Sequence, residues 1–216
     1  EYSHGSIESE IAFTTDVQAN WNELLAAPTL SVRQEFLVNT TTAGNQSTIG
    51  SHQAVAADGC GNYIVVWSDD GADGSGWGVF AQRFDFNGNA LGSEFQVNVM
   101  ATGDQMEASV AMNDSGQFVI TYTYYTGANG GILMRRFAAD GTAVDASDVH
   151  VNVGYTVGNQ HSPTVAINSS AQVVIAWQSD GVTEGVYAQA FDFATPITSD
   201  NLTTSTIIVD AGADAN

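Results

Sequence analysis

The sequence predicts an all-β protein of three tandem four-stranded antiparallel blades, propeller-like in arrangement, with a short N-terminal extension. Three observations lead to this prediction. A set of landmarks recurs every 55 residues, short β-branched and aromatic runs lie between the landmarks, and Asp-Gly or Asn-Gly pairs punctuate the runs. Such pairs tolerate the positive φ of tight turns. Four strands in about 55 residues match a propeller blade better than the much shorter rung of a β-helix.

Five landmarks define the repeat. Val55-Ala56 recurs as Val110-Ala111 and Val165-Ala166, at intervals of 55 residues. The others are a large aromatic residue, a segment ending in Val-Asn, a Gly-x-Gln triplet and a strand that opens with glycine. The aromatic residue is Trp67, Tyr122 or Trp177, and the segment ending in Val-Asn is 35–39, 94–98 or 148–152. The Gly-x-Gln triplet is 44–46, 103–105 or 158–160, and the strand that opens with glycine is 78–84, 131–137 or 185–191. A fixed period held over five landmarks indicates a tandem repeat.

Each repeat is expected to contain four strands. Phe36, Val38 and Thr40 recur at every second position, as in a strand, whereas the strand expected at 63–68 contains a β-branched and aromatic run at 63–67, typical of a strand buried on both faces. Two further strands are expected at about 53–57 and at 79–85. In chain order the four are strands A, B, C and D, and we expect each repeat to fold its own four strands into one sheet.

The ends of the chain lie outside the repeats. Residues 1–32 are predicted to form an extension, with a strand at 7–15 and a helix at 16–27 that stops before Pro28. The repeats occupy about 33–92, 93–146 and 147–199, so a strand at 206–210 falls where a fourth strand A would stand. Three blades are too few to close a ring. The C-terminal segment 200–216 is therefore expected either to complete a blade within the chain or to pair with a neighbouring chain.

The composition excludes several classes of partner. The chain has 216 residues, 44% of them hydrophobic, so it can bury a core without disulfides or a metal. It carries 24 acidic residues against four arginines and no lysine, a net charge of −20. Nucleic acids and anionic membranes require clustered Lys and Arg, so neither is an expected partner. No apolar run is long enough for a transmembrane segment.

The first repeat resembles a known family. The likeness rests on Glu35-Phe36-Leu37-Val38-Asn39-Thr40, Gly44-Asn45-Gln46, Trp67-Ser68-Asp69-Asp70-Gly71 and Phe80-Ala81-Gln82-Arg83-Phe84-Asp85. These segments are similar to repeats of very large secreted bacterial proteins, which include cyanobacterial and marine surface proteins and often carry RTX-type calcium-binding repeats. The likeness spans about residues 33–193 and is weakest where Tyr124-Tyr125-Thr126-Gly127 replaces the acidic turn. It implies an extracellular or cell-surface location, an adhesive or structural role, and no catalytic residues to transfer.

An acidic turn is the candidate metal site. Asp69, Asp70 and Asp73 lie in a glycine-rich turn of the first repeat, and Asp180 with Glu184 forms a thinner version in the third. Calcium takes several oxygen ligands on a flexible loop, so it is the cofactor considered. The alternative is a solvated hairpin, because the spacing is not that of an EF-hand loop and Asp-Gly pairs form turns unaided.

Trp77 is the candidate ligand-binding residue. It lies in the glycine-rich turn outside the repeat pattern, so its ring is expected to be free to stack on a sugar. Trp67, Tyr122 and Trp177 recur in register and are expected in the core. The four histidines lack metal-ligand spacing, and the single Cys60 has no basic neighbour, so neither zinc nor a catalytic thiol is expected.

These features predict a function without catalysis. No pair of carboxylates stands in a recognisable glycosidase motif, so the chain is not expected to be an enzyme. The main prediction is an extracellular structural or adhesive module of a bacterial surface protein, which associates with itself or with a cell-surface or matrix partner. Two alternatives stay open. One is a filament subunit joined by exchange of terminal strands, and the other is a lectin-like propeller that binds glycans in pockets between blades.

Overall fold

The computed structural model describes residues 34–127, 129–153, 158–180, 184–194 and 206–210. The chain divides into two compact units, 1–36 and 37–216, and all described strands belong to the second. Regular structure in the described residues is entirely β, which confirms the predicted all-β class. No helix that could cross a membrane occurs in this part of the chain. The predicted extension at 1–32 lies outside the described residues.

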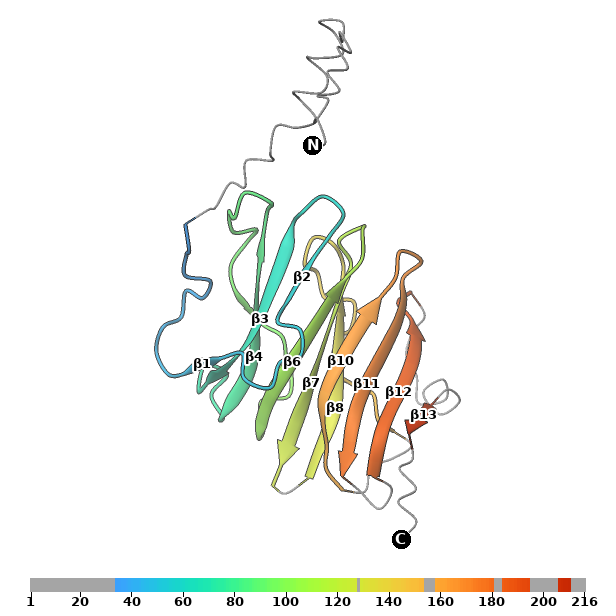
Figure 1. Ribbon diagram of the computed structural model, residues 1–216. Coiled ribbons are helices and arrows are strands. Elements are labelled where there is room, and N and C mark those ends of the chain that lie inside the picture. The colour runs from blue at the N-terminus through green and yellow to red at the C-terminus, as the bar shows by residue number, and fades with distance from the viewer. Residues whose placement is uncertain (1–33, 128, 154–157, 181–183, 195–205, 211–216) are drawn as a thin grey trace, which may run out of the picture. The chain divides into compact units, whose positions relative to one another are not determined.

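The strands form three antiparallel sheets, which lie side by side in chain order (Figure 1). The first sheet contains β1 (Gln46–Ser47), β2 (Val55–Ala57), β3 (Tyr63–Asp70), β4 (Trp77–Phe84) and β5 (Phe95–Gln96). The second contains β6 (Asp104–Met112), β7 (Phe118–Thr126), β8 (Asn129–Phe137) and β9 (Val149–His150). The third contains β10 (Gln160–Ile167), β11 (Gln172–Asp180), β12 (Glu184–Asp192) and β13 (Thr206–Asp210). The second and third sheets follow chain order, whereas β1 and β2 both pair with β3.

Each sheet combines strands from two repeats. β5 and β9 are the strands A of the second and third repeats, yet they pair with β4 and β8 of the repeat before. β13 pairs with β12 in the same way. This differs from the expected arrangement, in which each repeat would fold its own strand A into its own sheet. Residues 35–39 form no strand, because the described chain holds no earlier sheet for them to join.

Strand B is continuous in the second and third sheets but split in the first. β6 and β10 each contain a β-bulge, where Glu107 and Ser162 take positive φ values of 58° and 55°. In the first repeat the corresponding chain leaves the sheet between β1 and β2. The first sheet therefore has five strands rather than the expected four.

Two apolar cores hold the sheets together. The first contains Ile64 and Val66 of the first sheet with Phe118 of the second, and the other contains Val119 of the second sheet with Ile175 of the third. The aromatic landmarks are 4%, 0% and 2% exposed at Trp67, Tyr122 and Trp177. Their predicted place in the core is therefore confirmed.

The repeated polar landmarks fasten each sheet to the next. Asn98 accepts a hydrogen bond from the N–H of Val79 at 2.8 Å and donates to Oε1 of Gln105 at 2.9 Å. Asn152 likewise accepts from Ile132 at 2.8 Å, and it donates to Gln160 at 2.8 Å. The Val-Asn and Gly-x-Gln landmarks recur because each such pair joins the outer edge of one sheet to the first strand of the next.

Candidate functional site

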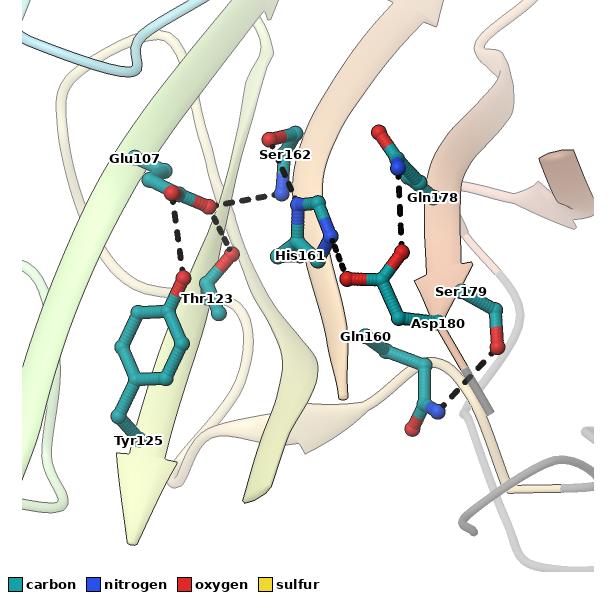
Figure 2. A network of polar contacts seen from close by, with 9 residues as sticks. All are labelled: Glu107, Thr123, Tyr125, Gln160, His161, Ser162, Gln178, Ser179 and Asp180. Carbon is teal, nitrogen blue, oxygen red and sulfur yellow. Dashed lines mark hydrogen bonds and ion pairs between the residues drawn. The ribbon is translucent and has the colours of Figure 1, made fainter. Parts of the chain in front are cut away.

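A polar network crosses from the second sheet to the third (Figure 2). At its centre, the carboxylate of Glu107 accepts hydrogen bonds from Oγ1 of Thr123 at 2.8 Å and Oη of Tyr125 at 3.1 Å. It also accepts one from the backbone N–H of Ser162 in β10, at 2.7 Å. Gly50 lies against the same side chain, since a Cβ at that position would stand 2.7 Å from Cγ of Glu107. Glu107 therefore links all three repeats at one point.

His161 continues the network along the third sheet. Its Nε2 lies 2.9 Å from Oδ2 of Asp180, and its Nδ1 lies 3.0 Å from Oγ of Ser162. Gln178 also donates to Asp180, at 3.1 Å. Figure 2 shows these side chains in one continuous row between β10 and β11.

Asp180, His161 and Ser162 have the residue types of an acyl-transfer triad. Such a mechanism also needs N–H groups aimed at the developing oxyanion. The N–H of Ser162 is bonded to the Glu107 carboxylate, and the next residue is Pro163, which has no N–H. A carboxylate at this point would repel an oxyanion. The network therefore acts as a structural tie between sheets.

Two tyrosines, the half-buried Tyr125 and the buried Tyr122, each donate a hydrogen bond to a carboxylate. The pKa of Tyr125 is raised well above its usual value. Burial is the main cause, and the negative charge of Glu107 is the next. Burial and the nearby Asp148 carboxylate raise the pKa of Tyr122 as well, and its hydroxyl donates to Asp148 at 2.6 Å. Both phenols stay protonated at neutral pH and serve as hydrogen-bond donors.

A pocket of about 200 Å³ opens where the chain passes from the second sheet to the third. It is lined by Tyr124, Thr126, Gly130, His150, Asn152, Val153 and Gln160. Gln160 belongs also to the network, because its amide donates to Oγ of Ser179 at 3.4 Å. This described lining combines aromatic rings, amides and a hydroxyl, and it contains no carboxylate.

Tyr124 supplies the aromatic wall of the pocket. Its ring lies over the backbone of Gly131, where an added Cβ would stand 2.9 Å from Cζ of the ring. His150 approaches edge-on, with ring centroids 5.3 Å apart and an angle of 88° between the planes. Tyr124 is half-buried and His150 is exposed, so solvent reaches both rings. Glycine at 131 fixes the wall, because any side chain there would displace the ring.

Asn152 and Gln160 supply the amides. Both are nearly buried, 6% and 0% exposed, and the hydrogen bond between them sets their orientation. Gly130 allows β8 to approach β10 closely, since a Cβ there would stand 2.7 Å from the carbonyl oxygen of Gln160. The amides are therefore held rigidly beside the aromatic wall.

The acidic residues expected to bind calcium occupy different environments. Asp69 is buried in β3 and accepts a hydrogen bond from Gln46 at 3.1 Å, and burial raises its pKa. Asp70 is exposed at the strand end, and Asp73 accepts from Nδ2 of Asn98 at 3.1 Å. No three His, Cys, Asp or Glu side chains in the described ranges are grouped so that they could hold a metal ion. The calcium site stays a prediction.

The other predicted site residues are placed as follows. Asp180 and Glu184 stand opposite each other across β11 and β12, and Asp180 is already bonded to His161 and Gln178. Trp77 begins β4, is half-buried, and occupies the register position that Gly130 holds in the second sheet. Its role as a ligand contact stays a prediction.

Sequence reasoning did not identify the pocket. Tyr124 stands where the first repeat has Asp69, so it counted only as a weakening of the repeat. The replacement of Asp69 by Tyr124 at this repeat position was the one signal in the sequence that could have pointed to the pocket. The meeting of Asn152 with Gln160 depends on how sheets pack, and no local pattern reveals it.

Comparison with known proteins gives a fold but no family. No protein-family model and no curated protein matches the chain. A protein of unknown function from Dyadobacter fermentans matches with a TM-score of 0.54 at 14% identity, over 74% of this chain and 42% of that one. A thermostable family-43 glycoside hydrolase matches with 0.41 at 10% identity, over 63% and 53%. An α-L-arabinofuranosidase from Podospora anserina, in complex with cellotriose, matches with 0.41 at 14% identity, over 80% and 54%.

These comparisons correct the main functional prediction. The chain spans about half or less of the length of the three proteins just named. The family-43 enzyme, the arabinofuranosidase and two further matches are enzymes that cleave glycosides. Another match belongs to a family of mannoside phosphorylases that also contains glycoside hydrolases. None of the matches with a stated activity is a structural or adhesive module, so that prediction is wrong as the leading interpretation. Self-association gains no support from them. Because identities are 10–14%, these likenesses show a fold alone.

Proposed function

We propose that this chain is a carbohydrate-binding module, that its three sheets are propeller-like blades, and that it holds one sugar ring in the pocket beside Tyr124. The observation that carries the proposal is the placement of a partly exposed aromatic ring beside two buried amides, Asn152 and Gln160. The proposal replaces the structural module and retains the lectin-like alternative from the sequence.

The chemistry of the pocket matches that of a sugar. A pyranose ring has an apolar C–H face and a rim of hydroxyl groups. The Tyr124 ring offers a flat apolar surface to the face. The Thr126 hydroxyl both donates and accepts hydrogen bonds, as sugar hydroxyl groups do, and the amides of Asn152 and Gln160, which are bonded to each other, give the pocket a rigid polar wall. A lining without carboxylates favours a neutral ligand over a cationic one.

The size of the pocket favours binding of a single ring. About 200 Å³ is below the roughly 300–1,000 Å³ of pockets for drug-sized ligands. The rest of a glycan would extend into solvent. A glycosidase needs two carboxylates beside the scissile bond, and the described lining has neither, so we propose binding without hydrolysis.

The test is a glycan array followed by calorimetric titration of the best ligand. Tyr124→Ala should weaken binding at least about tenfold, which corresponds to a loss of about 1.4 kcal/mol. Phe86→Ala is the matched control, because Phe86 is 60% exposed and lies outside the pocket, and it should bind as the wild type does. An array without any ligand, or equal loss in both variants, would refute the proposal.

A second variant tests the aromatic wall without removing it. Gly131→Ala should displace the Tyr124 ring and weaken binding. Gly59→Ala serves as the glycine control, because an added Cβ there would make only an ordinary contact, at 3.4 Å from Asp114. Release of reducing sugar from the bound glycan would contradict the absence of hydrolysis.

The extracellular or cell-surface location implied by the family resemblance belongs to this proposal. Fractionation of the source cells should place the protein outside the cytoplasm. Trp77 is proposed as a second contact, and Trp77→Ala should lower affinity less than Tyr124→Ala, because Trp77 does not line the pocket.

A further inference from the structure

The outward side of the third sheet exposes apolar residues that are buried elsewhere in the repeat. We define its outer face by register as Thr164, Ala166, Val174, Ala176, Val186 and Ala190. Val174 is 47% exposed and Val186 is 44% exposed. This face is also hollowed, by a cavity of about 540 Å³ whose lining includes Ala166, Val174 and Ala190.

The equivalent positions in the other two sheets are covered by the sheet that follows. Val174 corresponds by the repeat to Ile64 and Val119, which are both 0% exposed. Ile64 packs in the core between the first and second sheets, and Val119 in the core between the second and third. Val79 and Ile132, which correspond to Val186, are also 0% exposed. The outer face of the third sheet thus has the composition of a surface that packs on another sheet.

The first sheet exposes the complementary surface. By register its outer face contains Val55, Tyr63, Val65 and Phe80, together with Trp67 and Gln82, which are only 4% and 2% exposed. Val55 is 53% exposed, whereas its repeat equivalents Val110 and Val165 are 0% and 3% exposed. Those two valines face the preceding sheet within the two cores. The outer face of the third sheet and the part of the first sheet around Val55 therefore expose surfaces that are buried at the equivalent positions inside the stack.

One internal contact would be missing from such an interface. Arg83 and Arg136 reach from one sheet to backbone carbonyls beyond it: Arg83 donates to Ala139 at 2.8 Å, and Arg136 to Phe193 at 2.6 Å. The corresponding residue of the third sheet is Ala190. Contact through this face would thus rest on apolar packing, with no arginine to strengthen it.

We propose that the outer face of the third sheet docks the outer face of the first sheet of a second copy of this chain. The contact is head to tail, so it uses two different surfaces. Two chains would bring together six sheets, a number within the range of roughly four to eight blades found in propellers. Because each copy carries a net charge of −20, association should strengthen as salt screens the repulsion.

Sedimentation velocity of the full chain tests this contact. In about 0.5 M NaCl, where screening is strong, the wild type should sediment as a dimer or larger. Val174→Asp and Val55→Asp should each sediment as a monomer. Val144→Asp is the matched control, since Val144 is 48% exposed and belongs to neither face, and it should associate as the wild type does.

Mixing the two monomeric variants separates a lost contact from a folding defect. Val174→Asp retains an intact first sheet and Val55→Asp an intact third, so an equimolar mixture should form dimers that neither variant forms alone. A monomeric wild type, or a mixture that stays monomeric, would overturn the proposal. Glycan binding by the Tyr124 pocket is measured separately, so either proposal can fail without the other.

Discussion

Single residues have different roles according to whether they follow the repeat or depart from it. Asn98 and Asn152 follow it, and each fastens one sheet to the next. Tyr124 departs from it, because Asp69 stands at that position in the first repeat. The change replaces a buried carboxylate with the aromatic wall of a pocket. In this chain the departure at Tyr124 marks the pocket that we propose as the sugar site.

Asp69 should make stability depend on pH. It is 1% exposed, and burial is the main cause that raises its pKa above 3.8. A carboxyl with a raised pKa in the folded state favours folding when protonated. This contribution is complete below the unfolded pKa and is lost as pH rises through the folded pKa. Asp69→Asn should therefore raise the Tm at pH 7, by about 2–4 °C for a gain of about 1 kcal/mol.

The Tm difference between Asp69→Asn and the wild type should shrink as pH falls toward 3.8. Asp70→Asn is the control, since Asp70 is the exposed neighbour, and it should change the Tm less. Calorimetry between pH 4 and 8 makes both measurements. A Tm below that of the wild type at pH 7 would show that the carboxylate form of Asp69 stabilises the fold.

Among the elements, β6 and β10 are joined by the Glu107 side chain as well as by the apolar core that contains Ala111 and Val165. Glu107→Ala removes three hydrogen bonds to a carboxylate, so it should lower the free energy of unfolding by about 2–3 kcal/mol. Glu107→Gln retains an acceptor for the Ser162 N–H and should lose less. Urea unfolding measures both, and ultraviolet titration should show the Tyr125 pKa falling in Glu107→Ala. An unchanged unfolding midpoint would mean that the cores alone hold these strands together.

The hairpin between β10 and β11 contains a strained residue. Ala171 has a φ of +59°, where the equivalent residues of the other repeats are Gly61 and Gly116. An L-residue in this region costs roughly 1–2 kcal/mol, so Ala171→Gly should stabilise the chain by about 1 kcal/mol after the loss of its methyl contact. Gly116→Ala is the reverse change and should destabilise, since its Cβ would stand 3.1 Å from that of Ala139. Thermal unfolding of the two variants measures both effects, and Tm shifts of the same sign would contradict the strain at Ala171.

Strand positions could be predicted from the sequence, but strand partners could not. The predicted strand 63–68 lies within β3 (Tyr63–Asp70), because a β-branched and aromatic run is a local signal. The pairing of β5 with β4 of the preceding repeat is set by packing and leaves no local trace. The bond from Ser162 to Glu107 joins residues 55 apart, so the network too was beyond sequence reasoning. The core aromatic residues were predictable because they repeat in register.

At the scale of the whole molecule, acidic charge dominates. The chain has a net charge of −20, and the described arginines are bonded to groups of the chain itself. Mutual repulsion among the acids should therefore destabilise the fold at low ionic strength. Raising NaCl from about 10 mM to about 150 mM shortens the screening length from about 30 Å to about 8 Å. We expect the Tm to rise by several degrees over this range, and a flat Tm would show that the carboxylates are too far apart to interact.

Calcium chloride at matched ionic strength separates screening from a specific site. Screening alone gives the same Tm as sodium chloride, whereas the calcium site predicted at Asp69, Asp70 and Asp73 requires a higher one. A site that binds only the folded chain adds about 2.7 kcal/mol when the ion is at 100 times its Kd. Asp73→Asn should then remove the excess, and Asp192→Asn, an exposed acid of the third sheet, should leave it. Equal Tm values in the two salts would exclude the site, because an ion held by three carboxylates must stabilise the fold that brings them together.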